Sequence, residues 1–127
     1  KALSMQLTHL IQEHKKPIVQ KNTPVSEVIS EISAKLVGAT AVLENNNVVG
    51  VITDGDLRRM MQSKLDYTKL TAQDIMSKDP FLMPYTTLAK EALILMQEKE
   101  ISQIIVTQSD SYIGVVHIHD ILNEGIY

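Results

Sequence analysis

The chain has 127 residues, 44% of them apolar, and a formal net charge of −3, which suits one domain or two small ones that share a core. Its twelve Lys and Arg residues are scattered and only 4% of its residues are aromatic, so we expect no nucleic-acid partner. The absence of cysteine excludes a disulfide framework and favours the cytoplasm.

No apolar run approaches the length of a membrane span and no signal peptide is visible, so we expect no membrane partner. The sequence begins at Lys1 instead of Met. We therefore expect it to be a piece of a longer protein.

The first patterned segment, Leu7–Glu13, is predicted to form a short helix that Thr8 can cap. Pro17 ends that segment and predicts an extended stretch at Ile18–Gln20. A helix is predicted next from an apolar stripe at helical spacing, made of Val25, Val28, Ile29, Ile32 and Leu36. A hairpin and a closing helix should follow, with strands Thr40–Glu44 and Val48–Thr53, turn Asn45–Asn47 and helix Gly55–Ser63.

The second half of the chain repeats the first. A shift of 64 places Glu27–Leu57 on Glu91–Ile121 without a gap. The second copy of the elements is predicted at Leu70–Met76 with Thr71 as cap, Phe81–Met83, Leu88–Ile101, Ile104–Thr107, Tyr112–Ile118 and Asp120–Glu124, with a turn at Ser109–Ser111. Two copies cannot form a solenoid, which needs at least three repeats.

We therefore predict a mixed α/β (α+β) fold of two strand-helix-strand-strand-helix units packed as a pseudo-two-fold pair. The expected division is an N-terminal linker with a short helix at 1–14, the first repeat at 15–63, a linker at 64–69 and the second repeat at 70–127. We also expect a homodimer whose contact surface includes Met60, Met61, Ile121 and Leu122.

A candidate binding site lies where the strand of each copy runs into a helix N-terminus, whose free N–H groups favour phosphate. In the first copy Thr53 can donate to a phosphate oxygen, Asp54 stands beside the helix start, Asp56 can accept from a ribose diol, and Arg58 and Arg59 can neutralise phosphate. A second interpretation stays open, because Thr53-x-x-Asp56 also has the spacing of a capping box. The two arginines could equally be solvated surface residues.

In the second copy the corresponding candidates are His117, His119 and Asp120. The two histidines stand two apart at a predicted strand end, so we expect them to face the same way. No third ligand follows at an obvious spacing, and we predict no metal site. We find no catalytic constellation and no nucleotide-binding glycine loop in the sequence.

The repeated unit and the Gly-x-x-Thr-x-x-Asp element at Gly50–Asp56 together resemble a CBS domain pair, or Bateman module. More narrowly, the string Thr-Asp-Gly-Asp-Leu-Arg-Arg at 53–59 and His-Ile-His-Asp-Ile at 117–121 are similar to the CBS pair of bacterial arabinose-5-phosphate isomerases. The same resemblance extends to Asp74-Ile-Met76 and Asp79-Pro80.

The resemblance implies a regulatory part of an isomerase whose separate SIS domain makes arabinose 5-phosphate for lipopolysaccharide or capsule sugars. The chain itself would then be no enzyme, and no cofactor is expected. The implied ligand is a nucleotide or nucleotide-sugar such as CMP-Kdo, held by Thr53 and Asp56 in the first copy and by His117 and Asp120 in the second. Two alternatives stay open: a structural oligomerisation module with a vestigial cleft, and a generic sensor of adenosine nucleotides.

Overall fold

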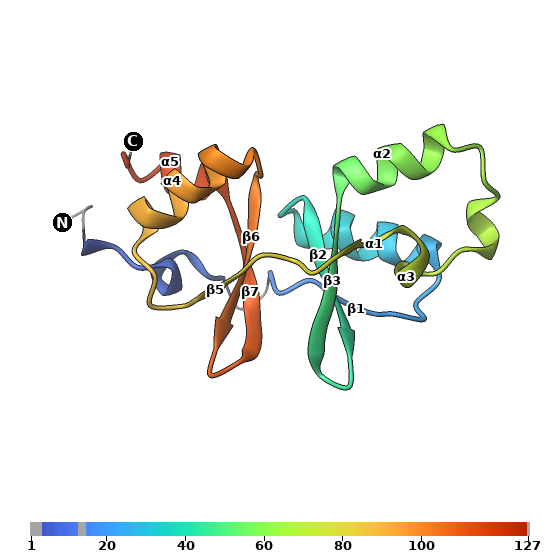
Figure 1. The fold of residues 1–127 in the computed structure, drawn as a ribbon, viewed down its shortest axis with the longest axis horizontal. Coiled ribbons are helices and arrows are strands. Elements are labelled where there is room, and N and C mark those ends of the chain that lie inside the picture. Colours follow the sequence, from blue (N-terminus) through green and yellow to red (C-terminus); the bar gives the residue numbers. More distant parts are fainter. Residues whose placement is uncertain (1–3, 13–14, 127) are drawn as a thin grey trace.

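The computed structural model of the chain describes residues 4–12 and 15–126. Two units, each a small sheet with its helices, lie side by side, and both hairpins project in the same direction (Figure 1). The predicted mixed α/β pair of repeats is confirmed. None of the helices in the described residues has the length and apolar character that crossing a membrane requires.

The first unit contains a four-stranded sheet in the order β1-β2-β3-β4, in which β1 is parallel to β2 and the other pairs are antiparallel. Its strands are β1 Ile18–Gln20, β2 Ala39–Glu44, β3 Asn47–Thr53 and β4 Ser77–Lys78. Its helices are α1 Val25–Lys35, α2 Asp54–Gln62, the 3-10 turn η3 Tyr67–Lys69 and α3 Ala72–Ile75. The short strand β4 was not predicted from the sequence.

The second unit repeats this arrangement with a three-stranded sheet in the order β5-β6-β7. Its strands are β5 Leu82–Pro84, β6 Gln103–Gln108 and β7 Ser111–His117, and its helices are α4 Ala89–Lys99 and α5 Ile118–Leu122. The 3-10 turn η2 Leu7–Leu10 packs on this unit as well.

Both hairpins turn through two residues with positive φ, Asn45 and Asn46 in the first unit and Ser109 and Asp110 in the second. Such two-residue turns follow the natural twist of paired strands. The predicted turns were one residue too long, because Asn47 already pairs with β2 as the first residue of β3. Ser111 likewise begins β7.

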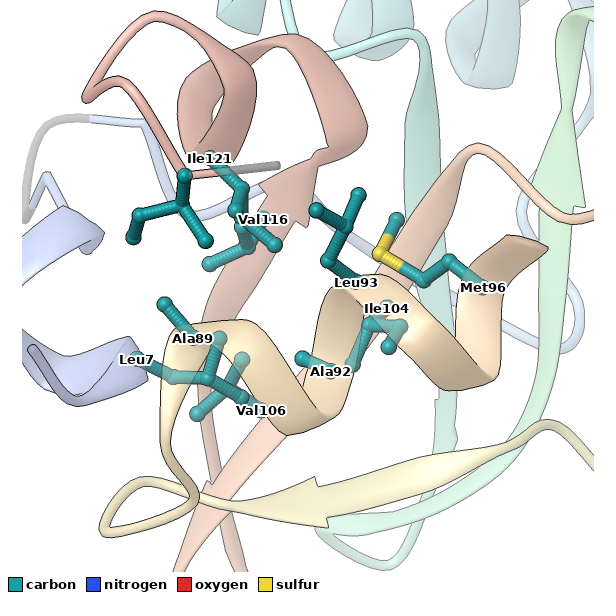
Figure 2. Close-up of a cluster of buried hydrophobic side chains, with 10 residues drawn as sticks. Leu7, Ala89, Ala92, Leu93, Met96, Ile104, Val106, Val116 and Ile121 are labelled. Atoms are coloured by element: carbon teal, nitrogen blue, oxygen red, sulfur yellow. The ribbon is translucent and has the colours of Figure 1, made fainter. Parts of the chain in front are cut away.

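Each unit is completed by the segment that precedes the other unit in the sequence. In the first unit Val25 N–H donates to Leu70 O at 3.1 Å and Ala72 N–H donates to Thr23 O at 2.9 Å. In the second, Leu7 N–H donates to Thr87 O at 2.9 Å. Leu7 is buried beside Ala89 and Val106 in the core of the second unit (Figure 2). The division of the chain into repeats at 15–63 and 70–127 stays a prediction from the sequence. In the structure the two units interlock, because each one also contains a segment from outside its own repeat.

The predicted helix over Leu7–Glu13 is only a short 3-10 turn, and Glu13 lies outside the described residues. Thr8 was predicted as its cap, but it lies inside the turn and Gln6 occupies the N-cap position. The reason is that His9 Nδ1 accepts the Gln6 N–H at 3.0 Å, which starts the turn earlier. In the second copy Thr71 does cap α3, and its N–H donates to Asp74 Oδ2 at 2.8 Å.

Two predicted core positions of α1 are exposed. Val25, Val28 and Ile32 are buried as expected, but Ile29 and Leu36 are exposed. Leu36 adopts a left-handed φ of 60° as the C-cap, which takes its side chain out of the helical stripe.

The predicted dimer surface was wrong in two of its four residues. Met60 and Ile121 are buried, because each lies on the inward side of its helix. Figure 2 shows Ile121 beside Val116 in the core of the second unit. Met61 follows Met60 by one position, about 100° around the helix, and is 74% exposed.

An apolar cluster joins the two units. Its buried members are Val37, Ala39, Ala41, Leu43, Ile105, Tyr112 and Val115. Within it the Tyr112 hydroxyl donates to Pro17 O at 2.6 Å, a bond from the second unit to the first. Burial raises the pKa of the Tyr112 phenol, so the hydroxyl stays protonated and able to donate.

We predict that Tyr112→Phe lowers the free energy of unfolding by about 0.5–1.5 kcal/mol, the net worth of one hydrogen bond. Urea denaturation would measure this loss. The matched control is Tyr67→Phe at an exposed position, which should change the stability by less than about 0.5 kcal/mol. Equal stability of Tyr112→Phe and the parent chain would contradict the role of this bond between the units.

Candidate functional site

A cleft of about 630 Å³ lies where the start of α2 faces the end of α4 and the start of β6. We call it the first cleft. Its lining comes from Val51, Thr53–Gly55, Arg58 and Arg59 of the first unit, from the crossover segment Ser77–Phe81, and from Lys99–Gln103 and Ile105 of the second unit. The ligand-sized space is therefore built by both repeats and by the chain that joins them.

A second cleft, of about 490 Å³, lies at the pseudo-equivalent place. It is lined by Ile32, Ser33, Leu36–Gly38 and Asp54 of the first unit and by His117, His119 and Asp120 of the second. In this cleft the second unit provides the strand end and the helix start, with β7 and α5, and the first unit provides the opposite wall. Asp54 lines both clefts.

The two clefts differ in charge. The first cleft is lined by four cationic side chains, Arg58, Arg59, Lys78 and Lys99, and by three carboxylates, Asp54, Asp79 and Glu100. The second cleft has the carboxylates Asp54 and Asp120 and two imidazoles, and a small pocket that adjoins it at His117 and Asp120 adds one cationic side chain, Lys15. The first cleft is thus the better receptor for an anion.

Thr53 is the N-cap of α2, and the capping box offered as one interpretation of the sequence is formed. Thr53 N–H donates to Asp56 Oδ2 at 2.9 Å, and Asp56 N–H donates to Thr53 Oγ1 at 3.3 Å. Thr53 lines the first cleft, whereas Asp56 is 5% exposed and is not among the lining residues. The structure therefore brings Thr53, Asp54, Arg58 and Arg59 together around the cleft and leaves Asp56 behind them.

Asp56 has two further partners. Arg59 Nη2 lies 2.6 Å from Asp56 Oδ1, and Ser77 Oγ donates to the same oxygen at 2.9 Å. Ser77 was not predicted as part of the site, because it stands 21 residues further along the chain. Only the pairing of β4 with β3 brings it close.

His117 is the N-cap of α5. Its Nδ1 accepts the His119 N–H at 3.0 Å, and its own N–H donates to Asp120 Oδ2 at 2.9 Å. The strand geometry predicted for the two histidines was wrong, because β7 ends at His117 and His119 belongs to α5. Their rings nevertheless lie 4.6 Å apart. In the described part of the chain, no three His, Asp or Glu side chains are grouped so as to hold a metal ion.

Burial lowers the pKa of His117 below its ordinary value of 6.5, and the neighbouring His119 lowers it further. Asp120 and Asp54 act in the opposite direction but do not reverse the shift. The imidazole is therefore neutral at pH 7. Because its Nδ1 accepts a hydrogen bond, its proton resides on Nε2, which leaves a neutral donor at the second cleft.

We predict that the stability gained from His117 is lost as the pH falls below about 6.5. Below that pH the unfolded chain takes up a proton that the folded chain resists, so the unfolded state binds more protons and becomes favoured. His117→Asn keeps a cap acceptor but does not titrate. The variant and the parent chain share the other three of the four histidines, so the comparison isolates His117. Urea denaturation between pH 5 and 8 should show a steeper loss for the parent, and parallel curves would contradict this.

Sequence reasoning missed the residues that reach the first cleft from the crossover segment, among them Lys78 and Phe81, and from the second unit, among them Lys99 and Gln103. Gln103 Nε2 donates to Gly38 O at 3.4 Å across the interface, and the Lys99 ammonium lies 5.4 Å from the centre of the Phe81 ring. No local motif marks these positions. The 64-residue repeat is the one signal that could have found them, because it implies that each cleft is built from both copies.

Comparison with known proteins agrees with this architecture. The sequence pattern of the CBS domain matches residues 11–63 and 72–126. Over 111 residues the chain is 38% identical to the uncharacterized protein RP505 of Rickettsia prowazekii and 34% identical to arabinose 5-phosphate isomerase KdsD of Escherichia coli K12. Each alignment covers 87% of this chain and 34% of the relative, so the chain spans about a third of their length.

Solved structures show the same fold. An uncharacterized conserved protein from Pyrococcus horikoshii superposes with a TM-score of 0.84 at 24% identity, covering 98% of this chain and 95% of the other. The CBS domain protein PAE2072 from Pyrobaculum aerophilum, determined in complex with AMP, gives a TM-score of 0.82 at 21% identity, covering 94% and 97%. With two matched copies and two interlocked units, this chain belongs to the CBS domain family as a tandem pair.

Proposed function

We propose that the chain is the regulatory, ligand-sensing region of a cytoplasmic arabinose-5-phosphate isomerase and that its first cleft binds the phosphate of a nucleotide or nucleotide-sugar. The observation that carries this proposal is the first cleft itself, with four cationic side chains around the start of α2. Helix N-termini and arginines are the usual receptors for phosphate. The identity to KdsD isomerases supports the link to the enzyme, and the AMP complex of a protein with the same fold supports the ligand class.

The proposed roles of the side chains follow their position. Thr53, Arg58 and Arg59 contact phosphate in the first cleft, where Asp54 can accept from a sugar hydroxyl. In the second cleft Asp120 accepts from hydroxyls. His117 and His119, which line the same cleft, donate to a sugar carboxylate or hydroxyl. The specific ligand that we propose is CMP-Kdo, because it combines phosphate, ribose and an acid sugar and is the activated end product that arabinose 5-phosphate feeds.

Regulation requires that the ligand bind two states of the whole enzyme with different affinity. Occupation of a cleft formed by both units favours the state in which the units keep this relative placement. The isomerase region would then respond through its connection to the pair. We accordingly expect this chain alone to bind the ligand without converting ribulose 5-phosphate.

We predict that CMP-Kdo raises the melting temperature of the chain. A ligand at about 100 times its Kd that binds only the folded state adds about 2.7 kcal/mol, which corresponds to a shift on the order of 10 °C. Melting curves with CMP-Kdo, CMP, AMP and ATP at equal ionic strength would measure it. A shift with AMP or ATP and none with the cytidine compounds would replace CMP-Kdo by an adenosine nucleotide.

A structural role as an oligomerisation module is favoured by one observation. Several large apolar side chains on or beside the helices are exposed, namely Ile29, Leu36, Met61, Leu65 and Ile94. Two-fold pairing of CBS pairs would bury such side chains. We therefore propose that the chain forms a homodimer through its helices.

We predict a dimer mass in light scattering at tens of micromolar protein. Met61→Glu should weaken the dimer by placing a charge in the contact, while Met61→Gln, with similar size and no charge, should weaken it less. A monomer mass for the parent chain would contradict the proposal. A dimer together with no melting shift for any nucleotide would favour the structural role over the sensor.

A further inference from the structure

The chain passes between the two units twice, and each passage carries a lysine. One passage is the crossover segment, whose Lys78 lines the first cleft. The other is residues 15–17, which lie between η2 on the second unit and β1 in the first. A shift of 63 places Lys15 on Lys78 and Pro17 on Pro80. The repeat therefore predicts that Lys15 stands to the second cleft as Lys78 stands to the first.

Lys15 lies beside the second cleft. It lines the small pocket that adjoins this cleft, about 40 Å³ in volume, together with Leu10 and Gln12. This pocket and the second cleft share four lining residues, Leu36, Val37, His117 and Asp120. Lys15 is half-buried, and its ammonium forms no ion pair or hydrogen bond with the described residues. An unpaired cation at the wall of a cavity attracts an anion.

The segment before Lys15 is seated on the second unit by a glycine. The side chain of Ile11 covers Gly114 of β7, where an added Cβ would lie 3.1 Å from Ile11 Cδ1 and 3.3 Å from its Cγ2. The matching Gly50 of β3 is covered by Met76, whose Cγ would lie 2.9 Å from an added Cβ. The same device thus seats the chain ahead of each lysine, so both lysines are placed by the fold.

The second cleft offers free acceptors for hydroxyl groups. Gly38 lines it with a left-handed φ of 75°, and an added Cβ there would lie 3.6 Å from Asp54 Oδ2 and 3.9 Å from His117 Cδ2. The missing side chain keeps the space beside these two groups open. Asp120 accepts one hydrogen bond from the described residues, that of the His117 N–H, so its carboxylate has acceptor positions left.

The two carboxylates decide what else the ligand needs. Asp54 and Asp120 repel an anion, so an anionic ligand has to be held by a cation. Lys15 is the one lysine or arginine among the described residues that line this cleft and its adjoining pocket. No Phe, Tyr or Trp is among those residues, whereas Phe81 lines the first cleft. The lining thus suits a ligand with hydroxyls and one acidic group, without an aromatic ring.

We infer that the second cleft binds a small hydroxylated anion, a sugar acid or a sugar phosphate, whose acidic group is received by Lys15. The hydroxyls of this ligand are accepted by Asp54 and Asp120. The inference rests on the proposed function and deepens it, because it names the residue that gives the second cleft its preference for acids. A ligand held by Lys15 also contacts the passage that connects the second unit to β1.

The test is an NMR titration of the full chain, observed at the ring signals of His117 and His119. The Gly55 amide reports on the first cleft in the same spectra. Gluconate and ribose 5-phosphate each combine hydroxyls with an acidic group, whereas ribitol has hydroxyls alone. At equal ionic strength the better of the two acids should bind at least about tenfold more tightly than ribitol, the worth of a hydrogen bond to a charged group. The tighter acid shows whether the site prefers carboxylate or phosphate.

Lys15→Gln should reduce the preference for the acid over ribitol to less than about twofold, the residue of weak surface electrostatics. The affinity for ribitol should stay unchanged, because its hydroxyls are met by the carboxylates. Lys15→Arg keeps the charge and should keep the preference. The matched control is Lys16→Gln, which removes the same charge one position along the chain. The Lys16 ammonium lies 5.6 Å from the centre of the Tyr112 ring and lines neither cavity, so the preference should persist. Melting curves establish that each variant is folded.

An equal preference for acids in Lys15→Gln and in the parent chain would overturn the role of Lys15. An equal loss in Lys16→Gln would also overturn it, because the effect would then be one of overall charge. Failure of both acids to move the His117 and His119 signals of the parent would overturn the anion site of the second cleft. The proposed function fails by a separate result, when no nucleotide raises the melting temperature and pyrophosphate leaves the Gly55 amide unmoved.

Discussion

The pairing of the two units is the constraint on which the rest of the structure depends. A unit of about 60 residues buries a small fraction of its surface and is only marginally stable alone. Here the two hairpins meet through a shared apolar cluster, and each unit is completed by the segment that precedes the other one. Both clefts are consequences of this pairing, because each combines a helix start from one unit with a helix end from the other.

The backbone of the two units is nearly symmetric, whereas their side chains are not. Asp54 N–H donates to Gly38 O at 3.3 Å, and at the matching place Ile118 N–H donates to Ser102 O at 2.8 Å. The same frame carries Arg59 in one unit and Asn123 in the other, and Thr53 in one and His117 in the other. A duplicated scaffold thus presents two chemically different clefts, one lined by four cationic side chains and one lined by two imidazoles and two carboxylates.

The repeat, the helical stripes and the hairpin turns were sufficient to predict the order of the main elements and most of the hairpin strands. Their edges were less predictable, because they depend on contacts outside the segment. Leu36 leaves the helical stripe because it takes a left-handed φ as the C-cap of α1, and η2 starts before Thr8 because the N–H of Gln6, outside the predicted helix, donates to His9. The short strand β4 has no pattern of its own and exists because Gly50 and Val51 of β3 offer an edge to Lys78 and Ser77.

For the site, the sequence could identify the helix starts at Thr53 and His117, because capping is local. It could not distinguish a ribose contact from a cap at Asp56, since both interpretations use the same spacing. The partners of Asp56 include Ser77, which is brought close only by the pairing of β4 with β3 and is therefore a tertiary contact. The cationic side chains contributed by Lys78 and Lys99 were also beyond local reasoning, because they arrive from the crossover and from the other unit.

The position of Ser77 gives the first cleft a physical connection to the rest of the chain. Asp56 Oδ1 is shared between Arg59, which faces the cleft, and Ser77, which begins the crossover segment between the units. An anion that attracts the guanidinium competes with Asp56 for its N–H donors. Weakening of that ion pair leaves the negative charge of Asp56 less compensated at the oxygen to which Ser77 Oγ donates. Because the crossover segment also lines the first cleft, a ligand there can act on Ser77 by direct contact and through Arg59 and Asp56, and regulation requires that such contacts differ between two states of the enzyme.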